Sequence, residues 1–551
     1  MKRLIFLSIL IVGLPLSRAD VLEVVPAEVD LLFAMEDLPA TQEDFHLTPL
    51  ARLMEDPQWS DFVAPMWEQI EFDDLKKRFT ENTGIEWEEA SRLITGGWAF
   101  FLDSLDAGPM SEWEQSPDIG IVLEVGKNED LIAQFFHDEM ESGDGDVAMV
   151  IEEYDGVEIF TEDKSGRDSA DTTEGDVVEA SDDATMFVAV FDGVCALTGR
   201  KDTLLSIIDR RRGRGVVESF RYSPQYDRIF EREGFADWLL WLHAPPIYSA
   251  LQTAIGEQPV PPASAEGQMP LRPTELLPAF GGDDFHGLYV VGSIEEDYTR
   301  SASGILYEPD AGGLWQLMPD GSERFPSPEW MPQEWNVVGT AAVDLSLLVP
   351  VLEGIAEDLN PAFIEMWNGM NLQFSQNFGV DLKEDIFGAL GTGIIMAQFH
   401  EGDAGISFEH TPMGQQPQLL AFKLRDADRL RLTWTTLQAR MFPQGALPPG
   451  MEARDYLGQE IVLMKSPSPI SPSKEQVIAL CITDEYFIIS LYSTYPLERA
   501  LQMLAGDEGG SLWDRPDVED DMAWTPREAV GLNRQDLAVV FAQVFGSLKN
   551  A

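Results

Sequence analysis

The pattern Tyr-x-Gly-x-Glu-Ile occurs twice in this chain, and this repetition constrains the fold more than any other feature. It reads YDGVEIF over 154–160 and YLGQEIV over 456–462, an offset of 302 residues. If the chain contains a duplicated unit, further matches must occur in the same order at a nearly constant offset.

Such matches run through the whole chain, and their order never breaks. They pair Pro26 with Pro332 (offset 306), Gly84 with Gly379 and Gly96 with Gly391 (295), Asp106 with Asp403 (297), Pro117 with Pro417 (300), Asp192 with Asp484 (292), and Ser219 with Ser511 (292). The offset changes only across segments that have the composition of loops. We interpret the series as an internal duplication in which each copy builds its own hydrophobic core.

The repeated motif predicts a hairpin corner rather than a catalytic signature. Asp155-Gly156 favours a two-residue type I′ turn, because that turn needs positive φ at both central positions. The second copy has Leu457-Gly458, which keeps the glycine and loses the aspartate. The flanking tyrosine and isoleucine then become strand residues.

Both copies show the same predicted series of elements. An early strand (29–35 or 337–343) leads into helices, and two strands, an amphipathic helix, two hairpins and a last helix follow. Asp56 and Asn360 precede prolines and are expected to cap the first long helix of each copy. Because hairpins dominate, we predict an α+β fold class: two pseudo-repeats, each a mostly antiparallel sheet built of hairpins with helices packed on one face.

The copies also set the predicted domain boundaries. These are a signal peptide over 1–19, repeat one over 20–256, a Pro-rich linker plus two-strand insertion over 257–331, and repeat two over 332–551. The inserted strands, FHGLYVVGSI and TRSASGILYE, are expected beside the sheet of the first copy or bridging both copies.

The N-terminus has the features of a secretory signal peptide. Lys2 and Arg3 precede an apolar run over 4–16, and the small residues of SRA over 17–19 predict cleavage before Asp20. The apolar run is short for a membrane span, and an uncleaved anchor is the alternative. We therefore expect a periplasmic or extracellular protein with no integral membrane span after cleavage.

Acidic residues far outnumber basic ones. There are 96 Asp and Glu against 37 Lys and Arg, which gives a formal net charge of −59. Such self-repulsion weakens the compact state, and salt screens it. The excess argues against nucleic acid and anionic membranes as partners, and it fits a secreted protein in salty surroundings.

The chain has two cysteines, Cys195 and Cys481, each inside an apolar, strand-like run. This number excludes a disulfide-dense scaffold. We interpret both as buried free thiols, because cysteine packs as a small apolar residue. A single disulfide is the alternative.

The sequence provides no catalytic, cofactor-binding or metal-ligating signature. It has no G-x-S-x-G, H-E-x-x-H, Walker or C-x-x-C pattern, and the GTG at 391–393 precedes a strand rather than a helix. His400 and His410 suggest a divalent metal, but their spacing matches no known ligand pattern. The stretch ESGDGD over 141–146 suggests calcium, but a solvated acidic loop explains it better. No cofactor is predicted.

Two further features have a structural and a functional interpretation. The basic run RRRGRG over 210–215 follows a predicted helix, where cations suit the negative end of the dipole; a site for a polyanion or acidic partner is the alternative. Most tryptophans have helical or strand spacing, so core packing is preferred over sugar stacking. Abundant carboxylates alone do not support a glycosidase.

The stretches VVPAEVDLLFAMEDL, LTPLARLMEDPQWSDFVAPM and GIEWEEASRLITGGWAFFL give the chain a resemblance to a protein family. It resembles duplicated secreted proteins of unknown function from planctomycete-like and related bacteria. The resemblance covers most of the mature chain, and its motifs are structural. It implies secretion and duplication, and it supplies no catalytic residues.

Three functional hypotheses follow. The first is an extracytoplasmic, non-enzymatic binding or scaffold protein with an envelope or extracellular ligand. The second is a secreted hydrolase with a carboxylate acid/base pair, which requires a pocket with carboxyl groups of raised pKa. The third is a carrier of an apolar or amphiphilic ligand, which uses the many Met and Phe residues.

Overall fold

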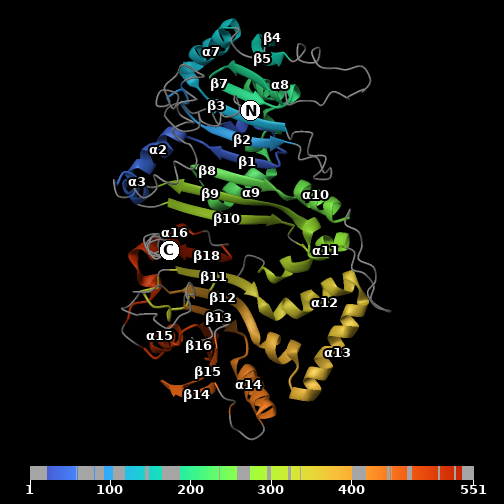
Figure 1. The fold of residues 1–551 in the computed structure, drawn as a ribbon, viewed down its shortest axis with the longest axis vertical. Coiled ribbons are helices and arrows are strands. Elements are labelled where there is room, and N and C mark those ends of the chain that lie inside the picture. The colour runs from blue at the N-terminus through green and yellow to red at the C-terminus, as the bar shows by residue number, and fades with distance from the viewer. Residues whose placement is uncertain are drawn as a thin grey trace. The chain divides into compact units, whose positions relative to one another are not determined.

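The computed structural model describes most of the chain, and Figure 1 shows its fold. The described residues are 21–56, 59, 80, 92–103, 118–142, 148–163, 186–234, 236–256, 273–294, 299–308, 310–319, 324–335, 337–399, 417–442, 447, 450–467, 475–506, 509–525 and 529–535. The predicted signal peptide, His400, His410 and most of the predicted first long helix of copy one lie outside them.

The chain divides into two compact units. Unit one comprises Met1–Glu266 and Asp283–Glu308, and unit two comprises Gly267–Gly282 and Pro309–Ala551. The region predicted as a linker with an insertion is therefore shared: its two strands belong to unit one, and its flanking segments largely belong to unit two.

Unit one is built on a ten-stranded sheet in the order β10-β9-β8-β1-β2-β3-β7-β6-β5-β4. Its strands are β1 (Leu31–Met35), β2 (Trp98–Asp103), β3 (Asp118–Glu124), β4 (Ala148–Tyr154), β5 (Val157–Asp163), β6 (Phe187–Phe191), β7 (Val194–Thr198), β8 (Trp238–His243), β9 (Phe285–Ile294) and β10 (Thr299–Tyr307). Its helices are α2 (Leu38–Leu47), α3 (Pro49–Met54), α7 (Glu129–Ser142), α8 (Lys201–Arg211), α9 (Pro224–Glu233) and α10 (Ala244–Gly256).

Unit two is built on an eight-stranded sheet in the order β14-β15-β16-β17-β13-β12-β11-β18. Its strands are β11 (Val337–Asp344), β12 (Leu390–Gln398), β13 (Gln418–Leu424), β14 (Met451–Tyr456), β15 (Gln459–Pro467), β16 (Glu475–Ile482), β17 (Tyr486–Leu491) and β18 (Gly531–Gln535). Its helices are α11 (Pro273–Ala279), α12 (Leu348–Leu359), α13 (Pro361–Phe378), α14 (Ala427–Met441), α15 (Tyr495–Leu504) and α16 (Pro516–Trp524).

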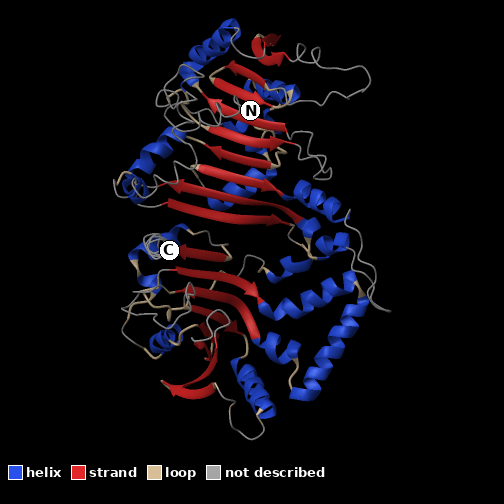
Figure 2. Cartoon of the chain, in the orientation of Figure 1, coloured by secondary structure: helices blue, strands red, loops and turns tan. Residues whose placement is uncertain are grey.

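The two sheets have the same topology. Read from its other edge, the order in unit two matches eight consecutive strands of unit one, from β8 to β4, in both pairing and sequence rank. Every pairing between these strands is antiparallel, as the hairpin pattern predicts. The predicted α+β class with two similar, hairpin-built sheets is confirmed. In both units, the sheets lie beside helices (Figure 2).

Matched residues from opposite ends of each copy meet in the fold. Pro26 forms an isolated β-bridge with Ser219, and Pro332 forms the same bridge with Ser511. The bridge is extended in unit one by a hydrogen bond from Phe220 N to Val25 O at 2.9 Å. Leu512 N donates to Met331 O at 2.7 Å in unit two. The matches Pro26–Pro332 and Ser219–Ser511, found separately in the sequence, are therefore the two sides of one β-bridge in each unit.

One match was wrong by a residue. In unit one Val122 pairs with Ala196, and in unit two Ala421 pairs with Ile488, which is the counterpart of Ala196 at offset 292. The strands β3 and β13 thus align at offset 299 instead of the 300 taken from their preceding prolines. A one-residue slip moves every side chain to the opposite face of a sheet. Prolines ahead of a strand do not fix that register.

Two strands, β8 and β18, and four helices, α9, α10, α11 and α16, were missed in the sequence, and α11 lies in the stretch predicted as a linker. The strands β8 and β18 occupy equivalent places beside β1 and β11, and the helices α9 and α16 precede them. The sequence of β8, WLLWLH, shows no alternation, and GLNRQ of β18 is mostly polar. The inserted strands β9 and β10 extend the first sheet beyond β8.

Each sheet has two faces, which we call face A and face B. Face A is covered by α8 and α9 in unit one and by α15 and α16 in unit two. Face B is the opposite face, which α7 covers in unit one. The core cluster on face A is present in both units, with Trp241 and Trp335 among its largest buried side chains.

Candidate functional site

The predicted type I′ turns are present, and they organise the polar surface of unit one. Asp155 and Gly156 have φ of 53° and 79°, and Leu457 and Gly458 have φ of 55° and 80°. The tyrosine of the repeated motif anchors each hairpin to the helix that follows the next hairpin, α8 in unit one and α15 in unit two. Tyr154 Oη donates to the Asp209 carboxylate at 3.2 Å. In unit two, Gln502 Nε2 donates to Tyr456 Oη at 2.7 Å.

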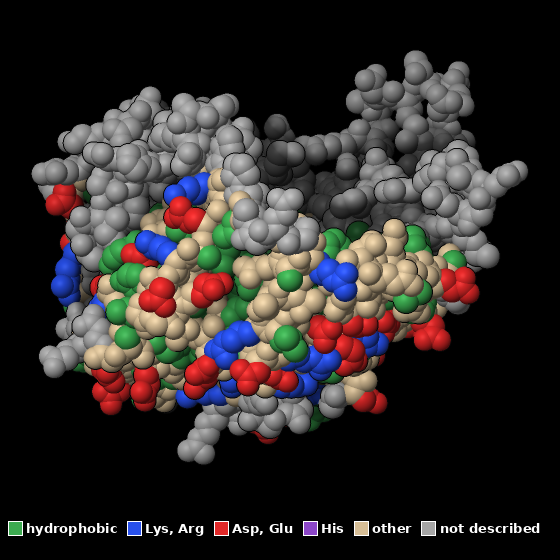
Figure 3. Space-filling model, turned by 90° about the horizontal axis from the view of Figure 1, so that it is seen from below, with side chains coloured by type: hydrophobic (Ala, Val, Ile, Leu, Met, Phe, Trp, Pro, Cys, Tyr) green, Lys and Arg blue, Asp and Glu red, His purple; other side chains and the backbone are tan. Residues whose placement is uncertain are grey.

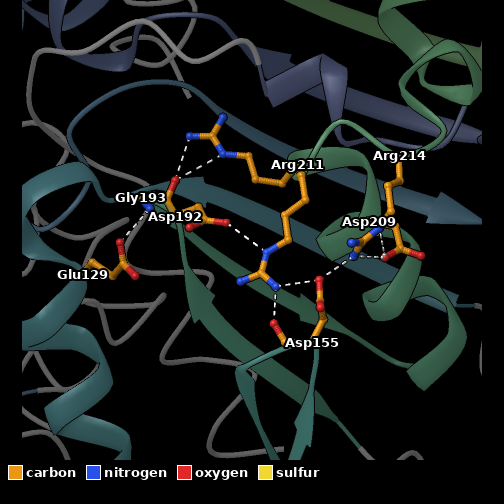
Figure 4. A network of polar contacts seen from close by, with 8 residues as sticks. Glu129, Asp155, Asp192, Gly193, Asp209, Arg211 and Arg214 are labelled. Carbon is orange, nitrogen blue, oxygen red and sulfur yellow. Dashed lines mark hydrogen bonds and ion pairs between the residues drawn. The ribbon is translucent and has the colours of Figure 1, made fainter.

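The basic run after α8 is bound to carboxylates and carbonyl groups of unit one, as Figure 4 shows. Arg211 donates to the carbonyl oxygen of Asp192 through Nε and Nη2, at 3.2 and 2.8 Å. Arg212 and Arg214 each donate to Asp155 Oδ2 at 2.8 Å. These guanidinium groups hold the two hairpin turns against the C-terminal end of α8.

Arg212 and Arg214 each contact a second carboxylate as well. Arg214 Nε donates to Asp209 Oδ1 at 3.0 Å, and Arg212 Nε donates to Asp192 Oδ2 at 3.2 Å. The hydrogen bonds from Arg212 and then Arg214 lower the pKa of Asp155 below its usual value. Because Arg212 and Arg214 are paired with carboxylates of the protein and Arg211 donates to a backbone carbonyl, the structural interpretation of RRRGRG is favoured over a polyanion site.

Carboxyl groups with a raised pKa were the requirement of the hydrolase hypothesis. Among the described carboxyl groups, burial raises the pKa of Asp118 and of Glu233. Asp118 lies on β3 and accepts from Thr203, and Glu233 accepts from Tyr289 Oη on β9 at 2.6 Å. Four strand intervals separate β3 from β9, or roughly 19 Å at the usual spacing. A glycosidase pair needs about 5–10 Å, so these carboxyls do not form one.

The described residues provide no metal site, and their two cysteines are unpaired. Within the described ranges, no cluster of His, Cys, Asp and Glu is arranged to hold a metal ion. Cys195 and Cys481 are both free and buried, as the sequence indicated. Burial raises the pKa of each thiol to about 12, so both are chemically inert at neutral pH.

Face B provides the clearest candidate for a binding surface. In unit one a ladder of side chains crosses six adjacent strands in register: Phe33, Phe100, Ile121, Leu197, Val188 and Phe160. In unit two the equivalent ladder is Gly339, Met396, Leu420, Ile489, Leu480 and Val462. Both ladders are apolar, so each sheet gains free energy when this face is removed from water.

Unit one buries four of its six ladder side chains and leaves Phe33 and Phe100 partly buried. Helix α7 lies over it, and its Ile132 and Phe136 are both buried in a common cluster with Ile121, Leu123 and Phe160. The rings of Phe136 and Phe160 stack with centroids 5.4 Å apart. Leu197 is 7% exposed. Face B of unit one is therefore a second hydrophobic core.

Unit two leaves its ladder partly open. Met396 is 46% exposed, and Leu420, Ile489 and Leu480 are only partly buried; Val462 alone is fully buried. A second row of side chains beside them, which includes Phe422 and Phe487, is also only partly buried. We call this apolar surface of β12, β13, β16 and β17 the open face.

Helix α14 lies against β16 but leaves the open face partly exposed. Polar contacts hold the helix to the segment that precedes β12. Arg429 Nε donates to Asp385 Oδ1 at 3.0 Å, and Thr433 Oγ1 donates to the carbonyl oxygen of Asp385 at 3.2 Å. These bonds fix α14 to the π-helical turn Leu382–Ile386. Of the predicted apolar face of α14, Leu430 is buried, whereas Met441 is 41% exposed.

One face of the molecule carries side chains of both charges. On the face drawn in Figure 3, acidic and basic side chains alternate along one rim, with hydrophobic side chains between them. Among described residues, no helix combines the length and apolar character needed to cross a bilayer. No family model, curated protein or solved structure matches this chain.

Proposed function

We propose that this protein is an extracytoplasmic, non-enzymatic binding protein that carries a non-anionic amphiphile on the open face of unit two. Secretion through the N-terminal signal peptide and descent from a duplicated unit are parts of this proposal. The signal-peptide pattern, the ordered sequence matches and the shared strand order support them.

One observation carries the proposal: the ladder that unit one mostly buries is left partly open in unit two. Keeping Met396, Leu420 and Ile489 in water has a free-energy cost of about 25 cal/mol for each Å² of apolar surface. Large exposed apolar surfaces in soluble proteins mark places where another molecule binds. An apolar chain laid across the ladder would remove this cost.

The charge of the chain selects the ligand class. A formal charge of −59 disfavours the approach of anions to the molecule as a whole. Fatty acids and anionic lipids are therefore disfavoured, and a neutral, zwitterionic or cationic head group with an apolar chain is favoured. Of the three functional hypotheses, this combines the binding protein with the amphiphile carrier.

The proposal is tested by titrating the purified protein with the neutral fluorescent probe N-phenyl-1-naphthylamine. We expect saturable binding, and Met396→Glu weakens it at least ~10-fold because bound ligand would bury an unpaired charge. Val217→Glu adds the same charge at a residue of unit one that is 78% exposed. This control keeps the affinity of the wild type.

The proposal fails if the wild-type protein shows no saturable binding, or if the two variants lose affinity equally. A second measurement identifies the ligand class. Mass spectrometry of the organic extract of protein purified from its native envelope fraction is expected to show a non-anionic amphiphile at near-stoichiometric amount. An anionic lipid at that amount would overturn the charge argument.

A further inference from the structure

A row of residues beside the ladder gives the open face of unit two a polar end. The row crosses β11, β12, β13, β17 and β16 in register, on the side of the ladder away from Phe422 and Phe487: Val337, Gln398, Gln418, Leu491 and Ile478. We call it the amide row. On these five strands, the other two rows of the face, the ladder and the row of Phe422 and Phe487, contain no polar side chain.

The two glutamines lie side by side on face B. Ala397 and Phe399, the neighbours of Gln398, are 1% and 2% exposed in the face A core, and Leu419, the neighbour of Gln418, is 0% exposed. Because successive strand residues point to opposite faces, both glutamine side chains project onto the open face. They are direct cross-strand partners, so their Cβ atoms are roughly 5 Å apart.

The amide groups of this pair are available to a ligand. Both glutamine side chains are partly buried, and neither forms a hydrogen bond with a described residue. Each carboxamide offers two N–H donors and one carbonyl acceptor. A polar group that binds between them can therefore both donate and accept hydrogen bonds.

The equivalent face of unit one has no such polar end. The corresponding positions, two residues beyond the ladder on β2 and β3, hold Leu102 and Ile119. Both are apolar and partly buried. The shared sheet topology therefore does not require amides in these places. The glutamines occur in the copy whose ladder is left partly open.

Strand β18 adds a third amide near the same end. Asn533 is exposed and pairs with Gly339 of the ladder, where unit one has Leu240 paired with Phe33. A Cβ added at Gly339 would meet no atom within 4 Å. Gly339 thus leaves an open space on the face between Met396 and Asn533. The side chain of Asn533 forms no hydrogen bond with a described residue.

The opposite end of the open face is apolar and aromatic. The rings of Phe422 and Phe487 stack with centroids 6.2 Å apart. Gln418 and Phe422 are four residues apart on β13, which corresponds to roughly 13 Å. A molecule with its polar end at the amide row would lay its apolar chain along the strands, across Leu420 and onto these rings.

We propose that Gln398, Gln418 and Asn533 bind the head group of the amphiphile, and that this head group is uncharged and rich in hydroxyl or amide groups. This inference rests on the proposed function and narrows its ligand class. Hydroxyl and amide groups can pair with both the donors and the acceptors of the three side chains. A charged head group would lose hydration without gaining an opposite charge, because the three rows contain no charged side chain.

Displacement of N-phenyl-1-naphthylamine from the full chain tests this inference. The competitors share a decyl chain and differ in the head group: decyl maltoside, decylphosphocholine and decyltrimethylammonium, each below its critical micelle concentration. About 500 mM NaCl screens the general attraction of the acidic protein for the cation. For the wild type, we expect decyl maltoside to displace the probe at a concentration at least ~5-fold lower than either ionic competitor does.

The double variant Q398L/Q418I introduces the side chains that unit one has at these positions. It is expected to keep its affinity for the apolar probe and to weaken decyl maltoside at least ~5-fold, because the hydrogen bonds to the head group are lost. The matched control Q373L/Q376I makes the same exchanges at exposed glutamines of α13 and is expected to behave like the wild type. Far-UV circular dichroism checks that each variant is folded.

A second variant tests for a gain of affinity, which misfolding cannot produce. Gln398→Glu places a carboxylate at the head-group end, so it is expected to strengthen decyltrimethylammonium at least ~5-fold relative to the wild type. Gln373→Glu adds the same charge on α13 and is expected to leave this affinity unchanged.

The outcomes separate this inference from the proposed function. A wild type that does not bind the probe overturns the proposed function, and this inference with it. Probe binding without a preference for decyl maltoside overturns the head-group assignment alone. The assignment is also overturned if Q398L/Q418I keeps the preference, or if the two double variants lose it equally.

Discussion

Units one and two share a sheet topology and one hydrophobic face, and they differ in how far the other face is buried. Face A has an equivalent core cluster, pair of helices and β-bridge in both units. On face B, the equivalent ladders are both apolar, but only unit one buries most of its own. The difference shows that two sheets with the same strand order and equivalent apolar ladders can differ in how completely helices cover them.

The contacts of α7 and α14 account for the difference between the two faces. In unit one, α7 offers Ile132 and Phe136 to the sheet. In unit two, Leu430 of α14 is buried, and Arg429 and Thr433 of the same helix donate hydrogen bonds to Asp385 in the π-helical turn. The ion pair between Arg431 and Asp484 also links α14 to the turn between β16 and β17.

The largest expected effect comes from opening face B in unit one. Phe136→Ala removes the ring that stacks on Phe160, and it should destabilise unit one by about 3–5 kcal/mol. Urea unfolding measures this loss. If it leaves the unit folded, N-phenyl-1-naphthylamine should gain a second binding site, and Cys195 should label faster with a thiol reagent than Cys481 does. A loss of stability under 1 kcal/mol would show that α7 does not seal this face.

A smaller effect is expected from truncating equivalent ladder positions. Leu197→Ala removes a buried side chain, at a cost of about 2–5 kcal/mol. Ile489→Ala, its counterpart in unit two, removes one that is already partly in water, so its cost should be about half as large. Urea unfolding of both variants gives the comparison. Equal losses would mean that the two faces are equally buried in solution.

The smallest effects are expected from exchanging the hairpin turns. Leu457→Asp places a residue that tolerates left-handed backbone at φ of 55°, and it should stabilise unit two by roughly 1 kcal/mol. The reverse change, Asp155→Leu, removes the carboxylate that Arg212 and Arg214 bind. The thermal unfolding midpoints of both variants measure these effects.

The pH dependence of Asp155→Leu sharpens the same comparison. The pKa of Asp155 is lowered in the folded protein, so its contribution to stability is present above its unfolded pKa of about 3.9 and is lost as the pH falls through the folded pKa. The wild type should therefore lose more stability than the variant between pH 5 and pH 2. Parallel pH profiles would show that this ion pair contributes nothing.

Local sequence patterns predicted much of the fold. The Asp-Gly and Leu-Gly turns, the Asn360 cap, the hairpins and the antiparallel sheets all followed from residues close together in the chain. Strand β8 was missed because WLLWLH is apolar without alternation, and the β3–β13 register was wrong by one residue because prolines outside a strand do not set its pleat.

The sequence did not predict the candidate site. Both ladders consist of apolar residues at alternating strand positions, so the pattern predicts burial equally for Leu197 and Ile489. The Asn360 cap of α13 was visible in the sequence, but the exposure of Met366 and Met370 was not. A helix of this composition is just as compatible with a buried position.

The sequence by itself determined the repeated topology, because turn residues and strand alternation act over short distances and each copy carries its own set. The tertiary structure alone decided which apolar faces are covered. That outcome depends on where a helix docks, and docking is set by contacts between residues far apart in the chain, such as those of Thr433 and Arg429 with Asp385.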